Sequence, residues 1–88
     1  MRLDVFLKRT GLLKQRTLAR EVCEGGQVRV DGRVAKASKE IAPGHTIALE
    51  MAYVFLEIEV VGLPHRNYKR REGEAFYRIM EERHKEVL

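Results

Sequence analysis

Near the middle of the chain stands Val28-Arg29-Val30-Asp31-Gly32-Arg33-Val34-Ala35, a run whose pattern predicts a tight β-hairpin. Alternating apolar residues flank the central Asp-Gly pair on both sides. Both central residues of a type I′ turn need a positive φ angle, which Asp and Gly tolerate better than most residues. One short strand is therefore expected on each side of the turn.

Two short helices are predicted before the hairpin, over residues 2–10 and 16–24. In each of them apolar residues recur three or four positions apart, as on one side of a helix. Gly11 and the Gly25-Gly26 pair follow these stretches and can end them. The apolar sides are formed by Leu3, Phe6 and Leu7 in the first helix and by Leu18, Ala19, Val22 and Cys23 in the second.

Two further strands are predicted after the hairpin. Pro43-Gly44 marks a turn, and apolar residues then alternate with others along residues 47–51 and again along residues 56–60. Within the second strand the alternation places Glu57 and Glu59 on the opposite side from the apolar residues. These two carboxylates are expected to face solvent or an element from the C-terminal end.

A helix that packs on the sheet is predicted over residues 72–85. Its apolar side is formed by Ala75, Phe76, Ile79 and Met80. The expected fold is α+β, with a helix pair, a hairpin, a small and mostly antiparallel sheet and a C-terminal helix. Residues 1–62 should form the main domain with its sheet, and residues 63–88 a basic linker and helix packed on it.

Positive charge is concentrated at the N-terminal end. The net charge is +4, and residues 1–20 carry six basic side chains against one acid, whereas residues 21–50 sum to −1 and residues 51–88 to zero. Clustered Lys and Arg favour a polyanionic partner because neutralised phosphates release their counterions. An ordinary solvated helix face would mix acids among the bases. The N-terminal segment is therefore expected to bind nucleic acid.

Other kinds of site lack the residues that they need. Cys23 is the only cysteine, which excludes an internal disulfide and a multi-Cys zinc site and favours a place in the core. His45, His65 and His84 are scattered without metal-ligand spacing. The chain has neither an apolar run long enough for a membrane span nor a signal segment. We expect a cytoplasmic, non-enzymatic protein with no cofactor, no metal and no catalytic residue.

The order of these elements resembles the S-four RNA-binding domain, also called the alpha-L RNA-binding motif. The resemblance covers about residues 1–50 and rests on many dispersed positions. The matching residues are Arg2-Leu3-Asp4, Leu7, Arg16, Ala19, Gly26, Val28, Val30-Asp31-Gly32, Lys36, Ser38, Gly44 and Ile47. Gln15 departs from the Ser or Thr that commonly caps the second helix in this family, which leaves the cap open between Gln15 and Thr17. Asp31 stands where Asn is common, and it suits the turn equally.

Within that family, the short chain and its expected C-terminal strand and helix most resemble the RqcP-like factors of bacterial ribosome-associated quality control, and residues 1–4 and 14–19 favour the same assignment. The resemblance implies a protein that binds large-subunit rRNA and P-site tRNA on obstructed large ribosomal subunits. It also implies an RqcH-type partner and support for alanine tailing of stalled chains. A related heat-shock family, which rescues free large subunits carrying stranded tRNA, has a longer basic C-terminal extension. A monomer without a membrane partner is expected.

The expected RNA-binding surface lies on the two helices and continues around the hairpin. Its cations should contact the phosphates and 2′-hydroxyls of an A-form helix, whose deep major groove hides the bases. Asp4 is expected to orient a nearby arginine by a charge-assisted bond rather than to touch RNA. The complete set is Arg2, Asp4, Lys8, Arg9, Lys14, Gln15, Arg16, Thr17, Arg20, Arg29, Arg33, Lys36 and Lys39. The basic run from Arg66 to Arg71 stays open as a second RNA contact or a solvated linker.

Three other functions remain open. The helix pair could belong to a helix-turn-helix DNA-binding protein, although the hairpin and the lack of a long recognition helix disfavour that. The module also occurs as an appendage of pseudouridine synthases and aminoacyl-tRNA synthetases, but a module that starts at Met1 with no catalytic domain after it favours an independent factor. A protein adaptor that docks through residues 70–88 is the third.

Overall fold

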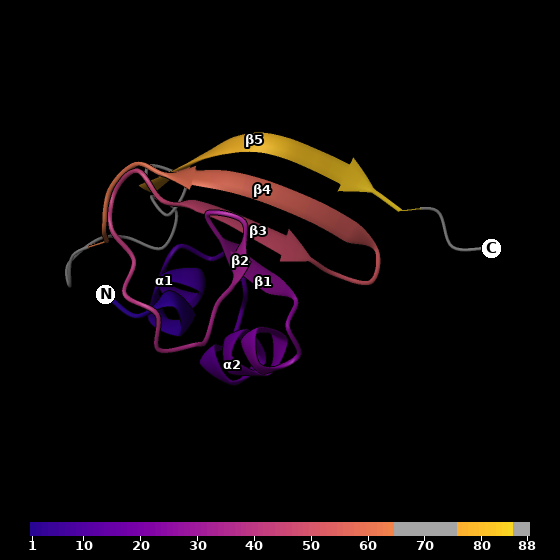
Figure 1. The fold of residues 1–88 in the computed structure, drawn as a ribbon, viewed down its shortest axis with the longest axis horizontal. Helices are drawn as coiled ribbons and strands as arrows, with labels where there is room; N and C mark the ends of the chain where they lie inside the picture. The colour runs from indigo at the N-terminus through magenta and orange to yellow at the C-terminus, as the bar shows by residue number, and fades with distance from the viewer. Residues whose placement is uncertain (65–75, 86–88) are drawn as a thin grey trace.

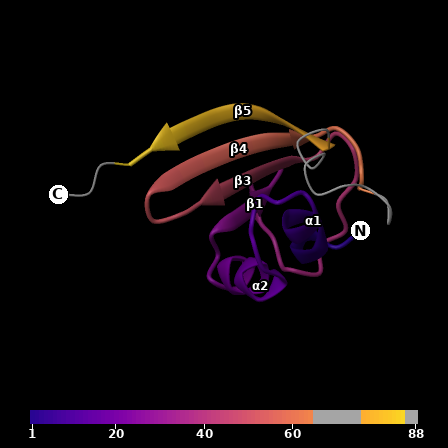
Figure 2. The same ribbon diagram turned by 180° about the vertical axis from the view of Figure 1, so that it is seen from behind.

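Two helices pack against one face of a single antiparallel sheet (Figure 1). The computed structural model describes residues 1–64 and 76–85. In this part the elements are α1 (Leu3–Arg9), α2 (Arg16–Glu24), β1 (Val28–Val30), β2 (Arg33–Val34), β3 (Thr46–Glu50), β4 (Val54–Val60) and β5 (Tyr77–His84). The sheet order is β2-β1-β3-β4-β5, and every neighbouring pair is antiparallel. The view from behind shows both helices on the same side of the long strands (Figure 2). The predicted α+β class is confirmed.

The hairpin forms where it was predicted. Asp31 and Gly32 have φ angles of 51° and 84°, as a type I′ turn needs, and Val30 stands opposite Arg33. Oδ1 of Asp31 also accepts a hydrogen bond of 2.8 Å from the backbone N–H of Thr46. The turn is thereby attached to the start of β3, which pairs with β1.

Both helices lie close to the predicted residues. The second begins at Arg16, directly after Gln15, and no side chain caps it. Its buried residues are Ala19, Val22 and Cys23, which are spaced as one side of a helix. Leu18 was expected to pack on Val22, but it is 36% exposed because it lies at the margin of the buried side of the helix.

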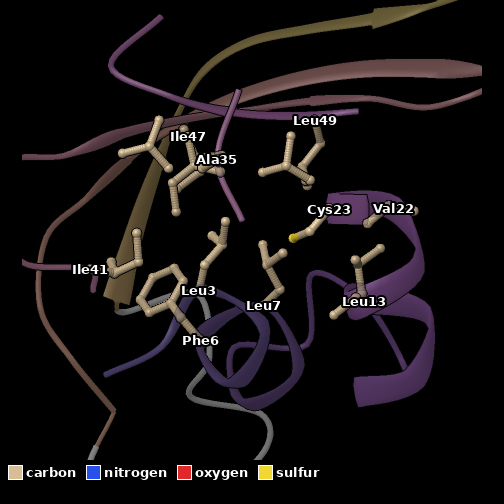
Figure 3. Close-up of a cluster of buried hydrophobic side chains, with 14 of the residues drawn as sticks. Leu3, Phe6, Leu7, Leu13, Val22, Cys23, Ala35, Ile41, Ile47 and Leu49 are labelled. Carbon is tan, nitrogen blue, oxygen red and sulfur yellow. The ribbon is translucent and has the colours of Figure 1, made fainter. Parts of the chain in front are cut away.

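The core lies between the helices and the inner face of the sheet (Figure 3). All of its members are less than one tenth exposed. They are Leu3, Phe6 and Leu7 from α1, Leu13 from the loop, Ala19, Val22 and Cys23 from α2, Val28, Val30, Ile47, Leu49, Ile58 and Val60 from the sheet, and Ala35 and Ile41 between strands. Cys23 is thus a core residue, as predicted. In the described ranges, the helices are too short and too polar to span a membrane.

The predicted C-terminal helix is wrong for the described residues, because Tyr77–His84 form strand β5 on the edge of the sheet. Ile79 stands opposite Ile58, and Glu81 stands opposite Glu57. Met80 is therefore the extra residue of a β-bulge. Ile79 and Met80 are each 51% exposed and do not enter the core.

Cross-strand pairs hold β5 in this register. Arg78 pairs with Glu59, and the Arg83 guanidinium lies 4.6 Å from the ring centre of Phe55. Glu59 thus faces a C-terminal element, which is one of the two arrangements expected for it. Lys85 Nζ lies 3.1 Å from a Glu50 carboxylate oxygen. The start of the predicted helix, residues 72–75, and the basic run 66–71 lie outside the described residues.

Candidate nucleic-acid interface

Asp4 is a fully buried carboxylate that binds one arginine from the start of each helix. Its Oδ1 accepts hydrogen bonds from the Val5 backbone N–H at 2.8 Å and from Arg2 Nε at 3.1 Å. Its Oδ2 accepts from Arg2 Nη2 at 3.3 Å and from Arg16 Nε at 3.4 Å. The arginine side chains are 44% and 54% exposed, whereas the carboxylate is 0% exposed. We call Asp4, Arg2 and Arg16 the Asp4 clamp.

The clamp contains the charge-assisted bond expected between Asp4 and a nearby arginine, and adds a second arginine from twelve residues further on. Both arginine side chains are about half exposed, and both guanidinium groups donate to the same buried acceptor. A guanidinium that is fixed in advance loses less side-chain entropy when it binds a phosphate. The Asp4 clamp is therefore suited to bind phosphate oxygens.

The segment after the hairpin is fastened to the start of α1. The Leu3 N–H donates to the Lys39 carbonyl at 2.8 Å, and the Asp4 N–H donates to the Ala37 carbonyl at 3.1 Å. These bonds satisfy two of the amide groups that the first turn of a helix leaves without partners. They also bring the segment that carries Lys36 and Lys39 beside Arg2.

Two adjoining hollows lie along this segment. The first, of about 560 Å³, is between α2 and the segment. Its lining residues are Arg2, Arg20, Cys23, Glu24, Gly26, Val34, Ala35, Lys36, Ala37 and Ser38. The second, of about 320 Å³, shares Val34, Ala35, Lys36 and Ser38 with the first and adds Val30, Arg33 and Lys39. The structure therefore gathers Arg2, Arg20, Arg33, Lys36 and Lys39 on one continuous surface, which we call the basic surface.

The remaining members of the predicted set lie apart from these hollows. Lys8 and Arg9 are in the last turn of α1, with Lys8 exposed and Arg9 half-buried. Lys14, Gln15 and Thr17 are exposed around the start of α2. Arg29 is not with the others, since it lines a hollow on the outer side of the sheet together with Glu50 and Glu57.

The pKa of the Cys23 thiol, which lines the larger hollow, is displaced from its ordinary value. Burial, and then the negative charges of Asp4 and Glu24, raise the pKa of its thiol to about 11. The thiol is therefore neutral at physiological pH. Among residues 1–64 and 76–85, no three His, Cys, Asp or Glu side chains are grouped to hold a metal ion.

The chain is similar to known proteins over most of its length. Residues 1–47 match the family model of the S4 domain, so the chain is an S4-domain protein. The RQC P-site tRNA stabilizing factor of Halalkalibacterium halodurans is 35% identical over 82 residues, which cover 93% of this chain and 92% of that protein. The factor of the same name from Bacillus subtilis is 37% identical over 82 residues, with 93% and 94% covered. The chain belongs to the family of RQC P-site tRNA stabilizing factors, which confirms the resemblance seen in the sequence.

A solved structure has the same fold. The trimeric structure of Vibrio cholerae Heat Shock Protein 15 superposes with a TM-score of 0.82 at 31% identity. The superposition covers 91% of this chain and 81% of that one. The likeness therefore extends beyond the S4 domain to most of the described sheet.

Proposed function

We propose that this chain is a non-enzymatic RNA-binding factor of ribosome-associated quality control that acts in the cytoplasm. The observation that carries the proposal is the Asp4 clamp beside the basic surface. Together they present Arg2, Arg16, Arg20 and Lys36 from three parts of the chain to one ligand. Membership of a family whose members are named for stabilising P-site tRNA supports tRNA and the ribosome as partners.

The contacts that we propose are mainly to phosphates. An A-form backbone would lie along the two arginines of the clamp and the other four cations of the basic surface. It would also pass Lys8, Arg9 and Lys14 near the ends of the helices. Six simultaneous contacts correspond to a slope of log K against log salt of roughly −5. Recognition would rest on backbone shape and 2′-hydroxyls rather than on paired base edges. Arg29 contributes little in this arrangement, because it lies on the outer side of the sheet.

The proposed partners are a ribosomal particle, its tRNA and one protein factor. In this proposal the chain binds large-subunit rRNA and P-site tRNA on obstructed large subunits, and supports alanine tailing with an RqcH-type factor. Residues 1–62 form the binding unit, and β5 completes its sheet. A second candidate is a heat-shock-type factor that acts on free large subunits with stranded tRNA, favoured by the likeness to Heat Shock Protein 15.

Sedimentation of tagged protein with cell lysate on sucrose gradients tests the proposal. Wild type should migrate with large subunits at low salt and be released at raised salt, and Arg16→Ala should be released already at low salt. Arg78→Ala is the matched control, because it removes the same charge from a 68% exposed side chain on β5. Wild type that stays at the top of both gradients would overturn the proposal.

Purified particles separate the two candidate roles. A quality-control factor should bind large subunits that carry peptidyl-tRNA and increase alanine tailing when an RqcH-type factor is added. A heat-shock-type factor should bind such particles without any effect on tailing. Preference for duplex DNA over rRNA and tRNA in competition would contradict both.

A further inference from the structure

The larger hollow has a lining unlike that of a simple phosphate site. Besides its cations it has apolar or weakly polar walls from Cys23, Val34, Ala35 and Ala37. Cys23 and Ala35 are only 3% and 7% exposed, so they form its deepest part. Apolar walls with a few polar groups are typical of sites that enclose a small organic group, whereas phosphate contacts come from cationic and hydrogen-bonding groups.

Val34 is the exposed apolar member of this lining. It lies on the edge strand β2 and is 58% exposed, although cations of the basic surface stand on both sides of it in the sequence and in the hollows. A single exposed valine is ordinary on its own. Beside a polyanion, however, it offers a surface that only an uncharged part of that polyanion can cover. In RNA that part is a ribose or a base, and of the two the base has the larger flat apolar face.

Glu24 adds a second requirement. Its carboxylate is exposed in the same hollow as Arg2, Arg20 and Lys36, and within the described part of the chain it forms no ion pair. A carboxylate repels phosphate oxygens but accepts hydrogen bonds from the amino groups of bases. The Ser38 hydroxyl in the same hollow can both donate and accept.

The charge state of the deepest part agrees with an uncharged ligand. Because burial raises the pKa of Cys23 to about 11, no thiolate stands there at physiological pH. A volume of about 560 Å³ lies within the range of small-molecule sites. The cations around it can meanwhile hold the phosphates on either side of an inserted nucleotide.

From these observations we propose that the hollow between α2 and residues 34–38 receives one unpaired nucleobase of the bound RNA, with Glu24 and Ser38 hydrogen-bonding to its edge. The inference rests on the proposed RNA binding and specifies the class of RNA. Extraction of a paired base costs unstacking energy, which an already unpaired base does not require. The ligand is therefore a helix with a bulged or loop base that carries an amino group, namely adenine, cytosine or guanine, in preference to uracil, whose edge offers Glu24 only the ring N3–H.

Two RNA hairpins test this inference in anisotropy titrations with the full chain at one fixed salt concentration. They are identical except that one has a single unpaired base in its stem, which is in turn adenine, cytosine, guanine or uracil. Wild type should prefer the hairpin with unpaired adenine, cytosine or guanine about tenfold over the continuous one, as expected for one or two added hydrogen bonds to the base edge. The preference for unpaired uracil should be clearly smaller.

Variants of the hollow should reduce the ratio between the two affinities. Ala37→Leu fills the space, and Val34→Ser removes an exposed apolar wall without threatening the core. Glu24→Ala should lower the preference for amino-bearing bases over uracil, although the lost negative charge alone would strengthen binding of any RNA. Thermal unfolding followed by circular dichroism verifies that each variant is folded.

The outcomes separate this inference from the proposed function. Equal wild-type affinity for the two hairpins, with both weakened by Arg16→Ala and neither by Arg78→Ala, overturns the base pocket and leaves RNA binding in place. A preference that survives Ala37→Leu, Val34→Ser and Glu24→Ala also overturns the pocket. Failure of wild type to bind either hairpin, tRNA or rRNA overturns the proposed function itself.

Discussion

Replacing Asp4 with Asn tests whether the buried carboxylate positions the arginines that bind RNA. The substitution keeps the shape of the side chain and raises the net charge from +4 to +5. Long-range electrostatics alone would therefore strengthen RNA binding. We expect weaker binding, because Arg2 and Arg16 lose the charged acceptor that sets their directions.

The magnitudes follow from the geometry of the clamp. Loss of one partner of a fully buried ion pair costs about 3–5 kcal/mol. Here both arginines are about half exposed and can turn to water, so about 2 kcal/mol of folding free energy is a better figure. In a domain of this size that corresponds to a fall in Tm of roughly 8–16 °C. Two side chains that must be ordered on binding cost about 0.5–1.5 kcal/mol each, which together lower the RNA affinity by roughly 5- to 150-fold.

Unfolding by urea and heat, followed by circular dichroism, measures the first quantity, and anisotropy at a temperature where all variants are folded measures the second. A double-mutant cycle with Arg16→Ala should give a coupling energy of about 1 kcal/mol. Glu40→Gln is the control, because it changes the net charge by the same amount as Asp4→Asn. Glu40 is 78% exposed and pairs only with the N-terminal amine among the described residues. If Asp4→Asn binds RNA as tightly as Glu40→Gln does, the positioning role is refuted.

Three further predictions concern the fold. The pKa of the Cys23 thiol is about 11 in the folded chain and 9.0 in the unfolded one. The free energy of unfolding should therefore fall by on the order of 2 kcal/mol as pH rises through this interval, because only the unfolded thiol loses its proton there. Cys23→Ala should abolish that fall in urea titrations. Met80→Ala should cost less than about 1 kcal/mol in the same assay, since a residue packed in a helix core would cost 2–5. Asp31→Asn should leave the Tm within about 3 °C of wild type, whereas Asp31→Ala should lower it by roughly 6–12 °C, because alanine neither accepts from Thr46 nor tolerates the positive φ.

The parts of the fold that could be predicted have local signals. Asp31-Gly32 specifies its turn through backbone conformation alone, and the two helices are bounded by residues that end helices. Strand β5 has no such signal. Phe76, Ile79 and Met80 have helical spacing, but the bulge at Met80 breaks the strand alternation and hides it. What makes the segment a strand is its pairing with β4, through Glu59 and Phe55, which lie about twenty residues or more away.

The candidate site likewise has a part that the sequence predicts and a part that it does not. The excess of positive charge and the pairing of Asp4 with Arg2 are visible in neighbouring residues, but the second bond, to Arg16, depends on how α1 and α2 pack. Arg29 was grouped with the basic residues on charge alone. The alternation of β1 could have excluded it, since Val28 and Val30 are buried toward the helices and Arg29 must then face the other side. The hollow beside α2 has no sequence signature, because it arises where two distant segments meet.

The Asp4 clamp and the hollow proposed to bind a nucleobase have residues in common, so a change in the clamp should also affect the hollow. Arg2 belongs to both, as it bonds to Asp4 and lines the hollow. The Asp4 backbone N–H also donates to the carbonyl of Ala37, which lines the hollow from the other side. Loss of the Asp4 carboxylate should therefore reduce the preference for an unpaired base as well as the overall affinity, whereas Arg16→Ala should reduce only the affinity, since Arg16 does not line the hollow. A preference ratio that is unchanged in Asp4→Asn, measured with the two hairpins, would mean that the two sites act independently.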